Sequence, residues 1–564
     1  MWWHRKGRLR GREITPDEIF LDSSNRAGLD AHQFEGRVER PVSPVSIAMV
    51  GVIFAVATFG FAAQAFNLQV VQGDTFAEIS RNNRIDRSVI FATRGIILDR
   101  NGKEIAWNEI ETDPNATTSS PYPLRSYIKA PGFAHILGFV RYPKTDSSGK
   151  WWREEYVGVA GIESLFNTEL AGLNGSTLSE TDARGGLVRE DIVDPAQDGA
   201  PLRLSIDADI QSELARRLTA HAETQRFQGG AAVVLDVETG ELIALVSFPE
   251  YDANAFAGGD VEKVSAVNQD PATPLLNRAV GGLYAPGSIV KPMFAAAALN
   301  EGLIDPEKKI LSTGSISIPN PYFPDKPSIF RDWKAHGWTD MRRAIAVSSD
   351  VYFYSIGGGF QDQKGLGIAK IDEYAKRFGF SLPTGILLGN EPVGTIPTPE
   401  WKEEVFGDPW RLGDTYNTAI GQYGFQVTPL QVVRYVAALA NGGKLLTPQL
   451  MWDLRSPTSA SVGISDAHLQ IVREGMRAAV TDGGTAAALN IDGLSIAGKT
   501  GTAQIGRNNE FMNSWVIGFW PYEKPKYAFA VVLEKAPAGT LSGASPAMSQ
   551  FFYWLRDNKP EYLQ

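Results

Sequence analysis

The chain has 564 residues, and 43% of them are hydrophobic and 21% charged. This is a globular composition, but the chain is too long for one ordinary domain, so we expect two or more. The net charge of −10 argues against a nucleic-acid-binding surface. The sequence has no cysteine, which excludes disulfides, thiolate metal sites and cysteine nucleophiles.

An uncharged segment near the N-terminus, VSIAMVGVIFAVATFGFAAQAF at 45–66, is long enough to cross a hydrocarbon core of about 30 Å. We predict one transmembrane helix here. A buried core helix would normally show a polar face, and a signal peptide would not normally follow 44 residues, so both alternatives are disfavoured. Because the tail 1–44 carries eight Lys/Arg residues, we predict that the tail is cytoplasmic and that the rest of the chain lies outside the cell membrane.

Residues 67–200 mix short extended runs with turns rich in glycine, proline and asparagine. The stretch TRGIILDRNGKEIA at 93–106 predicts a hairpin around Asn101-Gly102. No spacing of residues in this region indicates a catalytic site. We therefore predict a small β-rich domain that acts as a spacer, or pedestal.

The pattern changes in the region 201–560. Residues 207–223 have the apolar spacing of an amphipathic helix, and 231–248 predict two strands joined by a turn. Three more strands are predicted at 494–504, 513–520 and 527–534, and alanine-rich helical runs lie between the two groups. Strands at both ends with helices between them indicate an α+β domain, an antiparallel sheet covered by helices.

One stretch of this region, GGLYAPGSIVKPMFAAAAL at 281–299, predicts a helix with Pro292 near its start. Proline is tolerated only in the first helical turn, so the helix should begin at about Ser288. Residues three apart share a helix face, which would place Lys291 beside Ser288 at a helix N-terminus that favours negative charge. This arrangement could activate a serine nucleophile.

Two further motifs follow in order, Ser348-Ser349-Asp350 and Lys499-Thr500-Gly501-Thr502. A Ser-x-x-Lys match alone means little, since Ser126 to Lys129 and Ser147 to Lys150 also match. The middle motif is the weakest, because Ser23-Ser24-Asn25 is a better match to Ser-x-Asn. It is the order of the three motifs, and the helix start at Ser288, that single out this set.

The ordered trio resembles the signature of the penicillin-recognising serine enzymes, Ser-x-x-Lys, Ser-x-Asn and Lys-Thr-Gly. Three further stretches resemble class B penicillin-binding proteins: RGIILDRNG at 94–102, GVAGIESLFNTELAG at 158–172 and IGQYGFQVTPLQ at 420–431. Asp350 in place of the common asparagine, and RDWKAHG at 331–337, resemble the elongation-type members. The resemblance implies a transpeptidase domain (201–560) with a five-stranded antiparallel sheet covered by helices, on a β-rich pedestal (67–200) with one N-terminal transmembrane helix.

The resemblance also implies a role for each motif residue. Ser288 would be the acylated nucleophile, Lys291 its base and Ser348 a proton relay. Asp350 would orient either the substrate or Lys291, and Lys499 would be the source of the positive field. Thr500 and Thr502 would bind the terminal carboxylate of the substrate, and Gly501 would allow the substrate close to the strand. The backbone N–H groups of Ser288 and Thr502 would form the oxyanion hole.

The implied function is a peptidoglycan D,D-transpeptidase of cell elongation that β-lactams acylate. The alternatives are a hydrolase, either a D,D-carboxypeptidase or a β-lactamase, and a non-catalytic β-lactam receptor. Expected partners are stem peptides, a SEDS-family glycan polymerase and the elongation machinery. We expect no cofactor and no metal: some elongation-type relatives hold a structural zinc with aspartate, histidine and cysteine, and here Asp332 and His336 have no cysteine to complete the set.

Overall fold

The structure, a computed structural model, describes residues 43–82, 85–110, 120–181, 187–320, 322–323, 325–453 and 459–563. The chain divides into two compact units. The smaller consists of Met1–Asp86 and Glu180–Gly186, and the larger of Arg87–Ser179 and Leu187–Gln564. Each unit is described separately below. The Ser23-Ser24-Asn25 match and the predicted tail, apart from its last two residues, lie outside the described residues.

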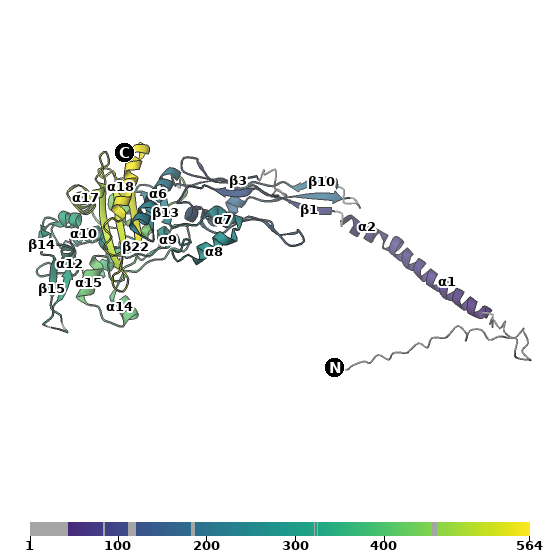
Figure 1. The fold of residues 1–564 in the computed structure, drawn as a ribbon, viewed down its shortest axis with the longest axis horizontal. Helices are drawn as coiled ribbons and strands as arrows, with labels where there is room; N and C mark the ends of the chain where they lie inside the picture. Colours follow the sequence, from purple (N-terminus) through teal and green to yellow (C-terminus); the bar gives the residue numbers. More distant parts are fainter. Residues whose placement is uncertain are drawn as a thin grey trace, which may run out of the picture. The chain divides into compact units, whose positions relative to one another are not determined.

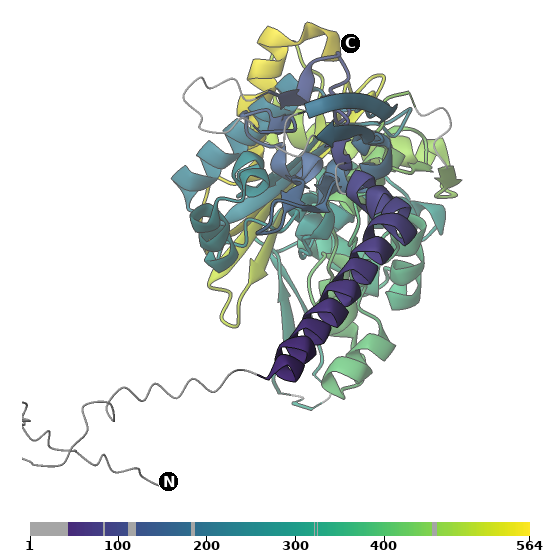
Figure 2. The same cartoon turned by 90° about the vertical axis from the view of Figure 1, so that its right-hand side faces the viewer.

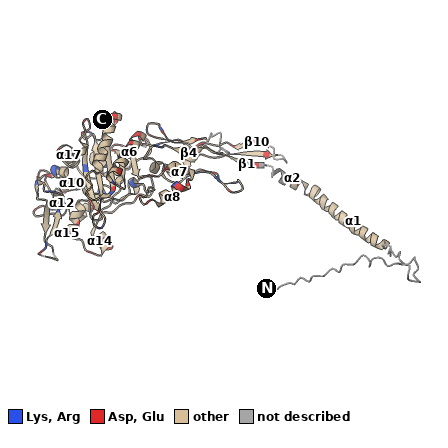
Figure 3. Ribbon diagram, in the orientation of Figure 1, with Lys and Arg blue, Asp and Glu red and all other residues tan. Residues whose placement is uncertain are grey.

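The smaller unit contains the predicted apolar helix, α1 (Pro44–Phe66), whose N-terminus is capped by Ser43. The helix is continuous and carries no charged side chain (Figure 1, Figure 2, Figure 3). Its side chains are exposed along the whole length. A helix that is apolar all round and unpacked needs an apolar surrounding, and this one is long enough to cross a membrane.

The region after α1 differs from the prediction. A β-rich domain was expected from residue 67, but the chain continues as a π-helical turn (Asn67–Val71) and a helix, α2 (Gly73–Asn82). The N-terminus of α2 carries Asp74 in its first turn, which complements the positive end of the helix dipole. The polar side chains of this segment suit a helix as well as a loop, and the apolar period is too short to decide between them.

The first part of the larger unit is rich in strands, as predicted. A four-stranded sheet has the order β11-β2-β3-β4, with β2 (Ile97–Leu98) and β3 (Glu104–Glu109) joined by the predicted Asn101-Gly102 turn. Beneath it Arg94 and Arg125 both bind the buried Glu163 carboxylate, at 2.5 and 2.7 Å. The remaining elements of this part are β1 (Ile85–Ile90), β4 (Leu124–Tyr127), α3 (Ala134–Leu137), β5 (Val140–Arg141), β6 (Lys144–Thr145), β7 (Trp151–Arg153), β8 (Val157–Gly158), α4 (Gly161–Leu165), α5 (Asn167–Ala171), β9 (Gly175–Thr181), β10 (Leu187–Asp194) and β11 (Leu202–Arg203).

The second part is built on a five-stranded antiparallel sheet with the order β13-β12-β22-β21-β20, which confirms the predicted sheet (Figure 1). Its strands are β12 (Gly229–Asp236), β13 (Leu242–Phe248), β20 (Ala497–Ile505), β21 (Phe511–Trp520) and β22 (Tyr527–Pro537). The pairing of β12 with β22 joins the N-terminal strand pair to the C-terminal strands. β20 is left as an edge strand.

Helices cover both faces of this sheet because its strands alternate between two apolar cores. Val233 and Leu235 face the core that includes α16 (Pro429–Ala440). Ala232 and Val234 face the core that includes α6 (Ala208–Gln225) and α18 (Ala544–Asn558). The alternation gives the central strand β12 no polar face, as expected for a strand buried on both sides.

The helices that carry the candidate site lie beside the edge strand. They are α10 (Lys291–Asn300), α11 (Met341–Val347), α12 (Asp350–Gly358) and α17 (Asp466–Thr481). The other elements of this part are α7 (Ala253–Gly258), α8 (Val261–Gln269), α9 (Arg278–Gly281), β14 (Ile310–Ser312), β15 (Ser315–Ile318), β16 (Ser328–Arg331), β17 (Gly337–Thr339), α13 (Gly367–Arg377), α14 (Pro399–Phe406), α15 (Leu412–Ala419), β18 (Lys444–Leu446) and β19 (Ser459–Ser461).

Candidate active site

Ser288 lies in a single 3-10 turn, Gly287–Val290, and the α-helix α10 begins three residues later than predicted, at Lys291. Pro292 occupies the first turn of α10, where a missing N–H breaks no hydrogen bond. Gly287 has a φ of +56°, and a Cβ there would lie 2.6 Å from the Thr502 carbonyl oxygen. The turn that carries Ser288 therefore presses directly against β20.

The side chain of Lys291 is fully buried and points toward the second motif. Its Nζ donates to Asp350 Oδ1 at 2.6 Å, to the Ser348 carbonyl oxygen at 2.8 Å and to Ser348 Oγ at 3.3 Å. The described hydrogen bonds include none between Lys291 and Ser288, although the two were expected side by side. Asp350 thus holds Lys291 in place, one of the two orienting roles that the sequence predicts for it.

Lys499 reaches the same serine from β20. Its Nζ donates to Ser348 Oγ at 2.8 Å and to the Thr500 carbonyl oxygen at 2.7 Å. Burial, and then the charge of the neighbouring Lys291, lower the pKa of Lys499 well below its usual range, while the Asp350 carboxylate opposes the shift. Ser348 Oγ therefore bridges two lysines, Lys291 and Lys499.

Ser348 has a left-handed backbone conformation, with a φ of +59°, at the junction of α11 and α12. Such a conformation costs about 1 kcal/mol or more for a residue with a Cβ, and it persists where the surroundings hold it. Ser349, not Ser348, is the N-cap of α12 and accepts a hydrogen bond from the Tyr352 N–H. Ser348 ends α11 through its backbone, so its hydroxyl is left to contact the two lysines.

Asp332 anchors this junction, a role that the sequence did not reveal. Its Oδ2 accepts from Ser349 Oγ at 2.8 Å, from the Val351 N–H at 3.0 Å and from Ser312 Oγ at 3.1 Å. His336 Nε2 lies 3.5 Å from Asp332 Oδ1. The only feature of the sequence that pointed to this role of Asp332 was its position in RDWKAHG, shortly before the second motif.

Within the described part of the chain, no group of three or more histidine, cysteine, aspartate or glutamate side chains could hold a metal ion. The Asp332 carboxylate is occupied by hydroxyl and backbone donors instead. Hydrogen bonds of this kind satisfy a buried carboxylate without a cation. Asp332 is therefore satisfied by hydrogen bonds, whereas the buried His336 Nε2 has no hydrogen-bond partner among the described residues.

The third motif lies on the edge strand. Thr500 Oγ1 donates to Thr485 Oγ1 at 2.7 Å, and the Thr502 side chain is exposed. A Cβ on Gly501 would lie 2.8 Å from Ile289 Cγ2 and 3.0 Å from the Pro286 carbonyl oxygen. The turn that carries Ser288 therefore approaches this glycine closely, and close approach of a substrate along the strand stays a prediction.

These residues line one cavity of about 700 Å³. Of the predicted site residues, Ser288, Ser348, Asp350, Thr500, Gly501 and Thr502 line it, while Lys291 and Lys499 are buried behind its wall. Lining residues that sequence reasoning missed include Tyr354, Asn417, Gln422, Thr485 and Gln504. Of these, only Gln422 falls within a stretch that the sequence singled out, IGQYGFQVTPLQ.

The other Ser-x-x-Lys matches lie elsewhere. Ser126 lies in β4, and Ser147 lies in an exposed turn between β6 and β7. Neither lines the cavity around Ser288. Glu301 lies just after the end of α10 and binds Tyr374 and Lys370. The carboxylates that line the cavity are Asp332 and Asp350.

A buried serine–lysine network on the edge strand of a helix-covered antiparallel sheet defines the class of penicillin-binding transpeptidases. Residues 230–553 match the family model of the penicillin-binding protein transpeptidase domain, and 114–204 match the penicillin-binding protein dimerisation domain. The chain belongs to the penicillin-binding protein transpeptidase family.

Relatives with a known function or a solved structure indicate which kind of penicillin-binding transpeptidase the chain resembles. The chain is 30% identical to the peptidoglycan D,D-transpeptidase MrdA of Haemophilus influenzae, over 88% of this chain and 89% of that protein. It is similar to penicillin-binding protein PBP2 of Helicobacter pylori in complex with MreC, with a TM-score of 0.69 and 28% identity, over 84% of this chain and 99% of that one. A peptidoglycan synthase complex matches with a TM-score of 0.71 and 26% identity, over 91% and 99%. The predicted membership among elongation-type class B proteins is confirmed.

Proposed function

We propose that the chain is a membrane-anchored serine D,D-transpeptidase that cross-links peptidoglycan stem peptides during cell elongation. The curated relatives support the activity by their names. The observation that carries the proposal is the hydrogen-bonded chain from Lys291 through Ser348 Oγ to Lys499, which lies against the cavity that Ser288 enters. Two amines joined through a hydroxyl can accept and return a proton, which acyl transfer to a serine requires.

The reaction would run in two steps. Ser288 Oγ attacks the carbonyl carbon of the penultimate D-alanine, the bond to the terminal D-alanine breaks, and the serine proton passes through the lysine network to the leaving amine. An amine of a second stem peptide then attacks the ester, and its proton returns to Ser288 Oγ. The N–H groups of Ser288 and Thr502 would hold the oxyanion; losing one such donor costs about 3 to 4 kcal/mol.

Two lysines could accept the serine proton first. Lys291 is closer to Ser288 along the chain, and Asp350 holds its Nζ at 2.6 Å. Lys499 has the lowered pKa. We assign the role of base to Lys291, as the sequence predicts. Ser348 and Lys499 would then accept the proton from Lys291. In the alternative, Lys499 is the base and acts through Ser348; comparing Lys291→Ala with Lys499→Ala distinguishes the two.

Hydrolysis is the alternative outcome, and it needs a carboxylate free to activate water beside the acyl-enzyme. Asp332 is engaged by three donors on one oxygen, and Asp350 is engaged by Lys291. Glu301 is bound to Tyr374 and Lys370 at the far end of α10. Because these carboxylates are already paired, they favour a long-lived acyl-enzyme that an amine resolves. They disfavour a β-lactamase, which must hydrolyse the acyl-enzyme.

Localisation and domain organisation follow the sequence prediction. Residues 45–66 would cross the membrane, 1–44 would be a cytoplasmic tail, and the pedestal (67–200) and transpeptidase domain (201–560) would be extracytoplasmic. The exposed apolar helix α1 supports a membrane anchor. The substrate of a transpeptidase is outside the membrane, so the activity and the predicted orientation agree.

Partners of the elongation machinery are proposed from the relatives. The H. pylori relative was solved in complex with MreC, and another relative belongs to a peptidoglycan synthase complex that coordinates polymerization and crosslinking. A scaffold of the MreC kind and a SEDS-family glycan polymerase are therefore the proposed partners of this chain.

A labelling experiment tests the function. The full-length protein in detergent should be labelled by a fluorescent penicillin at Ser288, and Ser288→Ala should abolish the label without changing the unfolding temperature. After free drug is removed, intact mass should show the adduct for hours, and an added amine should capture the acyl group of a D-Ala-D-Ala substrate. Loss of the adduct within seconds would identify a β-lactamase, and an adduct with no transfer to amines would identify a receptor.

A further inference from the structure

A cavity of about 600 Å³ lies between the strand-rich first part of the larger unit and the part built on the five-stranded sheet. We call it the junction pocket. His135 of α3 and Leu165 of α4 line it from the first part, and the segments 275–281 and 387–390 line it from the second. Among the described residues, none that lines this pocket also lines the cavity around Ser288. The junction pocket is therefore a separate candidate site, and its volume is typical of sites for small organic ligands.

The wall of the junction pocket is mainly apolar, and none of its described lining residues is an aspartate, glutamate, lysine or arginine. Leu275 and Leu387 are 44% and 60% exposed at its rim. Phe139 and Tyr251 meet edge to face at 6.0 Å, and Tyr251 meets the His135 ring in the same way at 5.4 Å. Ring surfaces of this kind pack well against a flat apolar ligand. A charged ligand would lose its hydration here without gaining a counter-ion.

Two buried polar atoms of the lining have no hydrogen-bond partner among the described residues: His135 Nε2 and Asn277 Oδ1. The His135 residue is only 7% exposed. Burial lowers the pKa of His135 to about 4, so near neutral pH the ring is uncharged, and Nε2 donates or accepts according to the tautomer. The Asn277 oxygen can only accept. Because unpaired buried polar groups are costly, a ligand that pairs with both atoms gains affinity.

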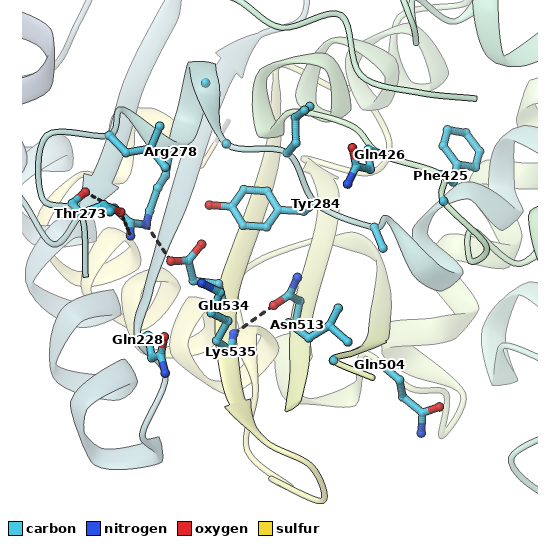
Figure 4. A pocket seen from close by; sticks show the side chains of 18 of the residues that line it. Gln228, Thr273, Arg278, Tyr284, Phe425, Gln426, Gln504, Asn513, Glu534 and Lys535 are labelled. Atoms are coloured by element: carbon cyan, nitrogen blue, oxygen red, sulfur yellow. Dashed lines mark hydrogen bonds and ion pairs between the residues drawn. The ribbon is translucent and has the colours of Figure 1, made fainter. Parts of the chain in front are cut away.

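The backbone that carries Asn277 is held in place by its neighbour. Arg278 Nε donates to Glu534 Oε1 at 2.9 Å (Figure 4), and the other guanidinium nitrogens donate to the Ala272 and Thr273 carbonyl oxygens. Asn277 is the N-cap residue of α9, but its side chain makes no capping hydrogen bond. The position of Asn277 is therefore fixed, while its side-chain oxygen is available to a ligand.

We propose that the junction pocket binds an uncharged aromatic molecule that carries a carboxamide group. One amide N–H donates to Asn277 Oδ1. The second N–H or the amide oxygen pairs with His135 Nε2, whichever the tautomer requires. The ring packs against Phe139 and Tyr251. This inference goes beyond the proposed transpeptidase function and does not depend on it, because the pocket is not part of the catalytic cavity.

The test pairs three probes with changes in the pocket. The probes are naphthamide, its N,N-dimethyl derivative, which has no N–H, and naphthoate, which is charged. Saturation-transfer NMR would measure their dissociation constants with full-length protein in lipid nanodiscs, and empty nanodiscs would serve as the blank. The variants are Asn277→Leu, His135→Phe and, as a matched asparagine outside the pocket, Asn268→Leu.

With the unaltered protein and with Asn268→Leu, naphthamide should bind about tenfold more tightly than either of the other probes, which corresponds to about 1.4 kcal/mol. In Asn277→Leu, naphthamide should bind no more tightly than the dimethyl derivative, because the acceptor is gone. His135→Phe should reduce the same preference. Labelling of Ser288 with penicillin beforehand should leave the dissociation constants unchanged. If His135→Phe does not fold, Asn277→Leu decides the outcome, since it removes no capping bond.

The amide could belong to a free molecule or to a peptide, because an aromatic residue in a peptide presents the same ring and amide. N-acetylphenylalanine methylamide distinguishes these sources. A lower dissociation constant than that of naphthamide would identify a peptide ligand, and a higher one would identify a free aromatic amide.

The site would be overturned if no probe bound above the blank, if naphthoate bound as tightly as naphthamide, or if Asn277→Leu kept the full preference for the amide. Loss of binding after penicillin labelling would place the probes in the catalytic cavity and would overturn the site as well. A protein that penicillin does not label but that keeps the amide preference would overturn the proposed function alone.

Discussion

Asp350 Oδ1 lies 2.6 Å from Lys291 Nζ, and the same ammonium lies 3.3 Å from Ser348 Oγ, which in turn accepts from Lys499. The three motifs are thus joined through one buried lysine and one hydroxyl. Burial, and then the charge of Lys291, lower the pKa of Lys499. The network thus divides the two lysines into one that is paired with Asp350 and one that has a lowered pKa.

This division predicts unequal effects of removing each lysine. If Lys291 is the base, Lys291→Ala should slow penicillin acylation by about 10²-fold or more, as loss of general base catalysis does. Single-turnover labelling measures the rate, and unfolding temperatures control for folding. Acylation near the unaltered rate in Lys291→Ala, together with a large loss in Lys499→Ala, would instead make Lys499 the base through Ser348.

Gly501→Ala should slow acylation because the new Cβ would lie 2.8 Å from Ile289 Cγ2 and push the turn that carries Ser288 away from β20. A misplaced nucleophile costs about 10²-fold in rate. The matched control is Gly258→Ala, where a Cβ would meet nothing within 4 Å. Labelling of both variants at the unaltered rate would show that the turn can adjust.

Asp332→Asn should lower the free energy of unfolding by about 1.5 to 3 kcal/mol, since the neutral amide loses charge-assisted hydrogen bonds to Ser349 and to the Val351 N–H. Acylation should slow as well, because these bonds hold the left-handed Ser348. Denaturant unfolding and labelling measure the two effects. As a control, Asp362→Asn changes an exposed carboxylate and should alter neither the free energy of unfolding nor the acylation rate. Equal results for the two variants would show that Asp332 does not support the second motif.

His135 predicts a pH dependence of stability. Burial lowers the pKa of His135 from 6.5 to about 4, so between these values the unfolded state binds a proton that the native state does not. Stability should therefore fall as the pH drops from 6.5 toward 4, by up to about 3 kcal/mol in total. Thermal unfolding across this range should show a shallower dependence in His135→Phe, which never binds the proton; identical slopes would contradict the assignment.

Local patterns in the sequence were sufficient for much of this structure. Apolar runs predicted the five strands, Asn101-Gly102 predicted a hairpin, and Pro292 predicted that a helix begins beside Ser288; each signal depends on residues close together in the sequence. The helices in 67–82 were not predicted, because the apolar period of this segment is too short to separate a helix from a loop. The order of the three motifs identified Ser288 among several Ser-x-x-Lys matches.

Only the tertiary structure brought Lys499 within 2.8 Å of Ser348 Oγ, across 151 residues of chain. It also showed that Asp332 holds the second motif, that Gly501 accommodates the Ser288 turn, and that His135 and Asn277 line one pocket. These facts depend on which distant segments pack together and on how deeply each charge is buried. The spacing of residues along the chain predicts neither the long-range contacts nor the depth of burial, because both are set by the packing of the whole domain.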